Sequence, residues 1–306
     1  MNKLRIGYFA DGPWSHKAIE LISADPNIDI LFITPRYDTQ DPVLKKWSEK
    51  LNIPFIVSEN VNSQEFCREM RGFDADVFVS MSFNQILKHE IINVPKFGFI
   101  NCHAGALPFY RGRNPLNWVL INGETEFGIT VHQVDSGIDT GDILLQRLYP
   151  IELNDDYGTL LNKAITECGN ILHDALSGFD ELVPKKQTDI HPVGTYFGMR
   201  KHGDEKLSFK NTSLDVFNFI RAITYPGPGA RFYVGGSEYI AWRSEMIENA
   251  PVYKATIGEV VGRSNKGVVI KTADTSILLT EISKVGCNER IIPTFRIGTR
   301  LADHER

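Results

Sequence analysis

The first half of the chain alternates short apolar runs with longer amphipathic segments. Strand-length apolar runs occupy residues 4–10, 28–34, 54–57, 75–81 and 97–102. Helical periodicity between them predicts helices over residues 15–23, 43–51 and 63–71, the last capped by Asn62 with Glu65. Strands separated by helices are typical of a parallel sheet covered on both faces. This alternation constrains the first half to a Rossmann-like α/β domain with a mostly parallel sheet.

The rest of the chain divides into three parts. A helix at 115–121, strands at 128–134 and 143–148, and an amphipathic helix at 156–176 complete a domain over residues 1–182. Residues 183–209 are polar and broken by Pro and Gly, which predicts a linker. After a helix at 213–224, short strand patterns follow at 231–234, 239–243, 254–261, 267–272 and 276–282. Their regular spacing predicts a small open β-barrel, OB-like, over residues 210–306.

Composition excludes several classes of protein. A net charge of −5 gives no overall basic footprint for nucleic acid, and no apolar run approaches the ~20 residues that cross a bilayer. The start of the chain reads as a strand rather than a signal peptide, so we expect a cytoplasmic protein without a membrane partner. The four cysteines form no CxxC pair and have no His at zinc-ligand spacing. We therefore expect free thiols and no metal.

The stretch 99-FINCHAGALPFYRGRNP-115 places a Cys between an Asn and a His. In a strand, side chains at i and i+2 share a face, so Asn101 and His103 project together and Cys102 points away. A nucleophilic thiol needs a base within hydrogen-bond reach, which this alternation denies to Cys102. The pattern therefore favours Asn101 and His103 as the functional pair and makes Cys102 a packing residue.

His103 stands where its strand ends, and ligands of open α/β sheets bind beyond the carboxyl ends of strands. A second loop, in 127-FGITVHQVDSGIDTGDI-143, offers Asp135, Asp139 and Asp142. Spacing alone does not choose among these three acids, since Asp is also common in turns. The turn 10-ADGPWSH-16 lacks GxGxxG, and no phosphate-binding GxxxxGK[ST] follows any strand, so neither NAD nor ATP is indicated.

Taken together, these motifs resemble the folate-dependent N-formyltransferases, which include methionyl-tRNA formyltransferase, glycinamide ribonucleotide transformylase and the nucleotide-sugar formyltransferases. The ordered elements are Asn101, His103, Leu107-Pro108, Tyr110-Arg111-Gly112-Arg113, Pro115, Trp118, Asn122-Gly123-Glu124, Gly128-Ile129-Thr130-Val131-His132 and Asp139-Thr140-Gly141. The segment 217-FNFIRAITYPGPGARFY-233 is similar to the start of the C-terminal barrel of that family. The resemblance therefore covers nearly the whole chain.

The resemblance implies that Asn101, His103 and Asp139 are catalytic and that 10-formyltetrahydrofolate is the formyl donor. Asn101 and His103 would stabilise negative charge on the formyl oxygen, and Asp139 would orient the His and accept the amine proton. The folate contacts implied by the family are Phe83, Asn84, Gln85, Ile86, Leu87 and Ile138. For Ile86 and Leu87, simple core packing is the alternative.

The acceptor implied by the resemblance is the amine of a UDP- or TDP-linked 4-amino-deoxy sugar, used for surface glycans such as lipopolysaccharide O-antigen. The string YRGRNPLNWVLINGETEFGIT is most similar to the enzyme acting on UDP-4-amino-4-deoxy-arabinose. Paired arginines suit a diphosphate, and the expected substrate contacts are Arg113, Arg111, Tyr110 and Trp14. The alternative for one of the two arginines is that it is a surface or structural residue. The alternative for Trp14 is that it only packs beneath its loop.

Three other functions stay open. Methionyl-tRNA formyltransferase carries a basic inserted loop after its second strand, whereas residues 33–47 here have mixed charge. A folate-binding homologue without activity is opposed by the intact Asn101, His103 and Asp139. A formyl hydrolase would replace the amine by water. A homodimer is compatible with any of these functions.

Overall fold

A computed structural model describes residues 3–287 and 289–305; residues 1, 2, 288 and 306, which the predicted domains include, lie outside the described residues. The chain forms two compact units, each assembled from three segments. The first comprises Met1–Gly112, Phe127–Tyr149 and Asn162–Phe197, and the second comprises Arg113–Glu126, Pro150–Leu161 and Gly198–Arg306. The domain limits at residues 182 and 210 stay predictions.

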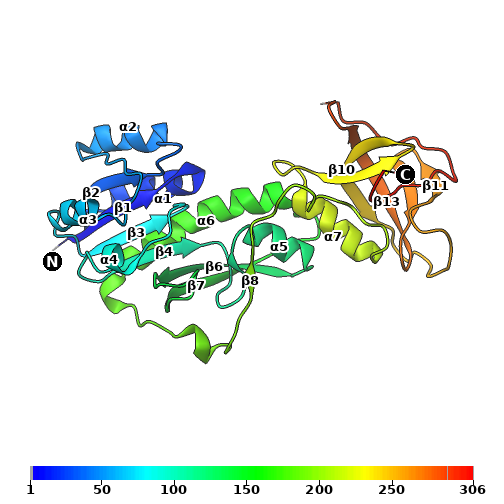
Figure 1. The fold of residues 1–306 in the computed structure, drawn as a ribbon. Helices are drawn as coiled ribbons and strands as arrows, with labels where there is room; N and C mark the ends of the chain where they lie inside the picture. The colour runs from blue at the N-terminus through cyan, green and yellow to red at the C-terminus, as the bar shows by residue number, and fades with distance from the viewer. Residues whose placement is uncertain (1–2, 288, 306) are drawn as a thin grey trace. The chain divides into compact units, whose positions relative to one another are not determined.

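A six-stranded sheet forms the centre of the first unit (Figure 1). Its strands are β1 (Leu4–Ala10), β2 (Ile28–Pro35), β3 (Val77–Met81), β4 (Phe99–His103), β6 (Glu126–Gln133) and β7 (Ile143–Pro150). They lie in the order β2-β1-β3-β4-β6-β7; β1 to β4 are parallel, and β6 runs antiparallel to β4. The predicted Rossmann-like sheet is confirmed. The run at 54–57 forms no strand and contributes only a bridge between Ile33 and Phe55.

The helices of this unit are α1 (Gly12–Ala24), α2 (Pro42–Leu51), α3 (Gln64–Arg71), α4 (His89–Ile92) and most of α6 (Tyr157–Ser177). The prediction that Asn62 caps α3 is wrong, because the Ser63 side chain accepts the N–H of Phe66. The Asn62 amide instead binds the loop after β3, donating to the Ile86 carbonyl at 2.9 Å and accepting the Lys88 N–H at 2.8 Å.

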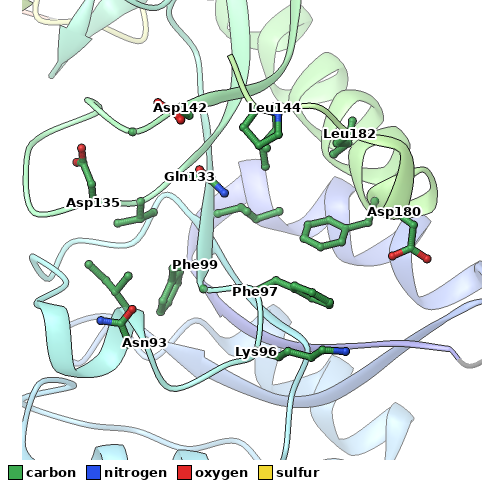
Figure 2. Close-up of a pocket in the computed structure, with 17 residues that line it drawn as sticks. Asn93, Lys96, Phe97, Phe99, Gln133, Asp135, Asp142, Leu144, Asp180 and Leu182 are labelled. Carbon is green, nitrogen blue, oxygen red and sulfur yellow. The ribbon is translucent and has the colours of Figure 1, made fainter. Parts of the chain in front are cut away.

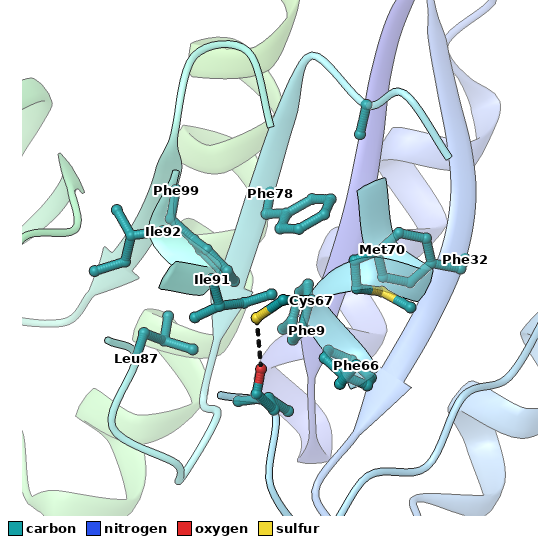
Figure 3. Close-up of a cluster of buried hydrophobic side chains, with 12 residues drawn as sticks. Phe9, Phe32, Phe66, Cys67, Met70, Phe78, Leu87, Ile91, Ile92 and Phe99 are labelled. Atoms are coloured by element: carbon teal, nitrogen blue, oxygen red, sulfur yellow. Dashed lines mark hydrogen bonds between the residues drawn. The ribbon is translucent and has the colours of Figure 1, made fainter. Parts of the chain in front are cut away.

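One face of the sheet carries an aromatic core (Figure 3). Phe9, Phe32, Phe78 and Phe99 come from β1 to β4, and their neighbouring ring centroids lie 4.9–5.7 Å apart. Phe66, Cys67 and Met70 of α3 cover them, with Leu87, Ile91 and Ile92 alongside. Because side chains two residues apart on a strand share a face, Phe99 directs Asn101 and His103 to this same face. The core thereby fixes the side of the sheet on which the predicted catalytic pair lies.

The second unit contains a five-stranded antiparallel sheet. Its strands are β9 (Ala230–Val234), β10 (Ser237–Met246), β11 (Val260–Ser264), β12 (Gly267–Lys271) and β13 (Ser276–Lys284), in the order β11-β12-β13-β10-β9. The predicted small β domain in the C-terminal part of the chain is confirmed, and its paired strands are antiparallel. The strand expected at 254–261 is displaced, because only Val260 and its successor belong to β11. Helix α7 (Ser213–Ile223) packs with α5 (Pro115–Ile121), where the buried Asn117 amide donates to the Ala222 carbonyl at 2.6 Å.

A small parallel pair of strands completes the first unit. β5 (Arg111–Gly112) pairs with β8 (Tyr196–Phe197), so part of the predicted linker is hydrogen-bonded to the segment after β4. Within residues 3–287 and 289–305, the helices are all too short or too polar to span a bilayer. Over the same residues, no three His, Cys, Asp or Glu side chains are grouped as metal ligands would be.

Candidate active site

The structure brings Asn101, His103 and Asp139 together within the first unit. Asn101 and His103 project from β4, and Asp139 comes from the loop between β6 and β7. Cys102 is buried on the other face, with its Sγ 3.6 Å from the Cys168 carbonyl of α6. Of the three acids that spacing left open, Asp139 is therefore the one whose carboxylate faces the pair.

His103 is held by a backbone carbonyl. Its Nε2 lies 2.7 Å from the carbonyl oxygen of Tyr110, and since a carbonyl can only accept, Nε2 carries a proton and donates it. Its Nδ1 then faces Asp139, 3.7 Å from Oδ2. A Cβ on Gly105 would stand 2.5 Å from His103 Nε2, so the close approach of this turn requires glycine. His103 is thus fixed in one tautomer or in the imidazolium form.

His132 is a fourth member of the site to which the sequence assigned no role. The antiparallel register of β4 and β6 places it directly opposite Asn101. Its Nδ1 donates to the Gln133 carbonyl at 2.7 Å, so Nε2 faces the site, 3.2 Å from Asn101 Nδ2 and 3.5 Å from Asp139 Oδ1. The motif Gly-Ile-Thr-Val-His ends in His132 and could have indicated a functional His. Only the strand pairing shows what His132 contacts.

Asp139 is a largely buried carboxylate between two imidazoles. Burial by itself raises the pKa of Asp139, but the positive charge available on His103 and His132, with the Gly112 N–H at 2.8 Å from Oδ2, more than offsets it. The pKa of Asp139 therefore lies well below its ordinary value.

This arrangement combines two chemical capacities. The Asn101 amide and a protonated imidazole of His103 can donate hydrogen bonds to an oxygen that gains negative charge. Asp139 and the two imidazoles can hold and exchange one proton. An acyl transfer to an amine needs both of these capacities.

The predicted folate residues divide into exposed and buried positions. Ile86 is 71% exposed and Ile138 is 49% exposed, which leaves both apolar side chains open to a ligand. Leu87 is buried in the aromatic core, which agrees with the alternative of simple core packing. The Phe83 ring packs against Phe9. Asn84 donates to Asp38, and Gln85 links Ser58 to Val61. Folate contacts through these six residues stay a prediction.

The four expected substrate contacts lie in different surroundings. Arg111 is half-buried, and its guanidinium donates to Gln187 and to the Val193 carbonyl. Tyr110 stacks on Phe197, with centroids 5.2 Å apart and planes 9° apart. Trp14 is half-buried in the first turn of α1, and Arg113 is exposed in the second unit. Contact of these residues with a substrate stays a prediction.

A groove of about 760 Å³ lies at the start of β4 and the end of β6 (Figure 2). Phe97, Phe99, Leu144 and Leu182 supply apolar walls, and Lys96, Asp135, Asp142 and Asp180 supply charges. Its lining includes none of Asn101, His103 and Asp139, and none of the six residues expected to contact folate. This groove is therefore separate from the site described above.

Two protein-family profiles match successive parts of the chain. A profile of the formyl transferase family matches residues 21–176, and one of the formyl transferase C-terminal domain matches residues 200–297. A methionyl-tRNA formyltransferase of Caldanaerobacter subterraneus subsp. tengcongensis is 33% identical over 266 residues, covering 85% of this chain and 83% of its own. The same enzyme of Geobacter sulfurreducens is 33% identical over 267 residues, covering 85% and 80%.

Similar solved structures include WlaRD, a sugar 3N-formyl transferase determined with dTDP and 5-N-formyl-THF. It is 22% identical, has a TM-score of 0.68, and the match covers 94% of this chain and all of WlaRD. An N-formyltransferase from Helicobacter canadensis, in complex with folinic acid and dTDP-3-aminofucose, is 20% identical with a TM-score of 0.68, covering 92% and 99%. These similarities extend over both units of the fold. By its sequence, the chain belongs to the formyl transferase family.

Proposed function

We propose that this formyl transferase moves the formyl group of 10-formyltetrahydrofolate to the amine of a UDP- or TDP-linked 4-amino-deoxy sugar. Asn101, His103 and Asp139 are assigned as its catalytic residues. The observation that favours a small acceptor over tRNA is the segment between β2 and α2, residues 36–41. It contains one cation, Arg36, and two acids, Asp38 and Asp41.

The side chains of this segment are engaged within the chain. Arg36 donates to the Ser82 carbonyl at 2.6 Å and to its hydroxyl at 3.0 Å, and lies 3.7 Å from Asp11. Asp41 accepts from the Gly12 N–H and from His16, each at 2.8 Å. The first N–H of α1 therefore already has an internal carboxylate, and no basic loop extends from residues 36–41 toward a polyanion. The absence of a basic loop argues against tRNA as the acceptor, whereas the carboxylate at α1 would oppose a phosphate of either acceptor.

The site residues fit the chemistry of this transfer. When bound, 10-formyltetrahydrofolate supplies the formyl carbon, and the exposed side chains of Ile86 and Ile138 would cover its flat rings. As the acceptor nitrogen bonds to that carbon, Asn101 and His103 donate to the formyl oxygen. Asp139 and its imidazole partners take the proton that the amine nitrogen loses, and that proton balances the one gained by the departing folate nitrogen.

An acceptor screen tests this proposal. Purified protein and 10-formyltetrahydrofolate are incubated with UDP-, TDP- and GDP-linked amino sugars, and mass spectrometry follows the gain of one formyl group. The Asp139→Asn variant is the matched control, because it preserves side-chain volume. We expect transfer to a UDP- or TDP-linked 4-amino sugar; transfer to none of these compounds contradicts the proposal.

Formylation of methionyl-tRNA is a second candidate, and two observations favour it. The relatives at 33% identity are named methionyl-tRNA formyltransferases. In addition, residues 198–306 contain 16 Lys and Arg against 12 Asp and Glu, although the whole chain has a net charge of −5. This local excess of cations gives the segment 198–306 some attraction for a polyanion, although the other two segments of the second unit add one Arg against five acids.

A direct competition separates the two acceptors. Charged methionyl-tRNA and the sugar panel are assayed side by side, and tRNA binding is measured from ~50 to ~200 mM salt. Six or more phosphate contacts would lower tRNA affinity by at least about 10³-fold over that range. Steep salt dependence combined with tRNA formylation would replace the sugar proposal, whereas weak, flat binding supports it.

A further inference from the structure

We propose that residues 185–197 form a strap that positions the catalytic side chains, and that the positioning residues are Gln187 of the strap and its partner Arg111 in the loop after β4. The sequence predicts a linker here, but the structure joins this segment to both loops that hold His103 and Asp139. The inference rests on the proposed function, since positioning matters only for a site that carries out transfer. It concerns the orientation of the site and is independent of the identity of the acceptor.

Gln187 links the strap to the Asp139 loop. Its side chain is 3% exposed, and its Nε2 donates to the carbonyls of Asp139 and Gly141 at 2.8 and 2.7 Å. Its Oε1 accepts from Arg111 Nε at 2.9 Å and from Nη2 at 2.7 Å. Because a guanidinium only donates and a carbonyl only accepts, these partners determine the amide orientation. All four hydrogen-bonding positions of the amide are thus used.

Arg111 connects this amide to the loop that follows β4. Its flanking residues make the two contacts that fix the site: the Tyr110 carbonyl accepts from His103, and the Gly112 N–H donates to Asp139. The guanidinium also donates to the Val193 carbonyl at 3.0 Å. Movement of Arg111 would therefore displace the partners of both His103 and Asp139.

The far end of the strap holds the same loop through its backbone. Thr195 donates its N–H to the Pro108 carbonyl, and its hydroxyl accepts the Tyr110 N–H at 2.9 Å. The Arg111 N–H donates to the Thr195 carbonyl at 3.1 Å, and the Tyr110 ring stacks on Phe197. At the near end, Lys185 and Ile143 exchange two backbone hydrogen bonds of 2.8 Å.

Backbone strain at the site explains why it needs such support. Tyr110 and Asp139 have φ angles of +58° and +54°, in the left-handed region that non-glycine residues rarely occupy. Strained residues of this kind persist where the surrounding structure over-determines them. Here the strap contacts both residues directly, through Thr195 and Phe197 for Tyr110 and through Gln187 for Asp139.

Two variants of one residue separate positioning from stability. Gln187→Ala removes both halves of the amide link. Gln187→Glu retains an acceptor for Arg111 but turns an oxygen toward the carbonyls of Asp139 and Gly141. Asn117→Ala is the matched control, because it deletes another buried amide that donates to a backbone carbonyl, in the second unit.

We expect kcat to fall about 100-fold in both Gln187 variants, the effect of a displacement near 1 Å, with KM changing by less than threefold. The decrease in Tm caused by Gln187→Glu should be no larger than the decrease caused by the control substitution Asn117→Ala. A second readout needs no acceptor: the ¹³C signal of the Asp139 carboxyl, followed from pH 7 to pH 4. This signal should stay flat in the wild type and in Asn117→Ala, and should begin to titrate in Gln187→Ala as its contacts loosen.

Unchanged kcat in both Gln187 variants would overturn the proposal that the strap positions the catalytic side chains. A carboxyl signal of Asp139 that stays flat in Gln187→Ala would overturn it as well. If the wild type transfers formyl to no acceptor, the proposed function fails by itself. The carboxyl titration then still decides whether Gln187 positions Asp139.

Discussion

Replacing Asp139 by asparagine isolates the charge of the carboxylate from its shape. The side-chain volume is conserved, and an amide oxygen can still accept the Gly112 N–H that lies 2.8 Å from Oδ2. What disappears is the negative charge 3.7 Å from His103 Nδ1 and 3.5 Å from His132 Nε2. The variant therefore tests the electrostatic role of Asp139 with little change in packing.

The size of the effect follows from these distances. At an effective dielectric constant near 20, a unit charge pair at this separation interacts by about 4–5 kcal/mol. The Asp139 side chain is 14% exposed, so solvent screens the interaction only in part. Because about 1.4 kcal/mol corresponds to a factor of ten, we expect kcat of Asp139→Asn to fall about 10³-fold.

The assay is steady-state formyl transfer with each substrate varied in turn. KM should change by no more than a few-fold, because the lost interaction acts on developing charge rather than on ground-state binding. A kcat within threefold of the wild type would exclude a catalytic role for the Asp139 charge, provided that circular dichroism shows both proteins folded. The identity of the acceptor does not enter this comparison.

The same variant tests how the contribution of Asp139 to the free energy of unfolding depends on pH. The pKa of Asp139 is lowered in the folded state, so its stabilising contribution is fully present above the unfolded pKa of about 3.9 and is lost as pH falls through the folded pKa. The difference in free energy of unfolding between wild type and Asp139→Asn should therefore shrink as the pH falls below about 4. Urea unfolding at several pH values measures it, and a difference that grows toward low pH would contradict the sign.

Three further variants have defined outcomes. Asn101→Ala removes a donor to the formyl oxygen and should lower kcat/KM by 10²–10³-fold, about 2.7–4 kcal/mol, whereas a loss under tenfold would rule out that role. Gly105→Ala puts a Cβ 2.5 Å from His103 Nε2 and 2.7 Å from the Tyr110 carbonyl, so activity should fall while unfolding in urea shifts by about 1–3 kcal/mol. Asp41→Ala removes the α2 cap and a partner of His16, which should cost about 2–4 kcal/mol in urea unfolding at neutral pH, against under 0.5 kcal/mol for the exposed Glu20→Ala.

Elements set by local pattern were predictable from the sequence. The strand at residues 4–10 and the helix at residues 115–121 match β1 and α5 residue for residue. The alternation that pairs Asn101 with His103 and turns Cys102 away needs only the two-residue period of a strand. For such features the sequence pattern and the packing agree.

Features that depend on pairing between distant segments were missed. His132 meets Asn101 through the register of β4 and β6, and no short turn fixes that register, because β5 and α5 lie between the two strands in the chain. Gln187 lies in a polar stretch without periodicity, yet its amide contacts residues 46 to 76 positions away. Strands as short as β5 and β8 have too few residues to show alternation. The polar composition of residues 183–209 predicted a segment in contact with solvent. Some of its polar side chains, such as that of Gln187, instead make buried hydrogen bonds.

The interleaving of the two units limits how this chain can be cut. The chain passes from one unit to the other five times, and α5 finds its partner α7 about one hundred residues later. A fragment ending at residue 182 would lack both α7 and Gln187, leaving the apolar face of α5 uncovered and the Asp139 loop without its amide partner. Neither unit is therefore a transferable module. During synthesis on the ribosome, the two earlier segments of the second unit cannot complete their packing until residues beyond 213 have emerged.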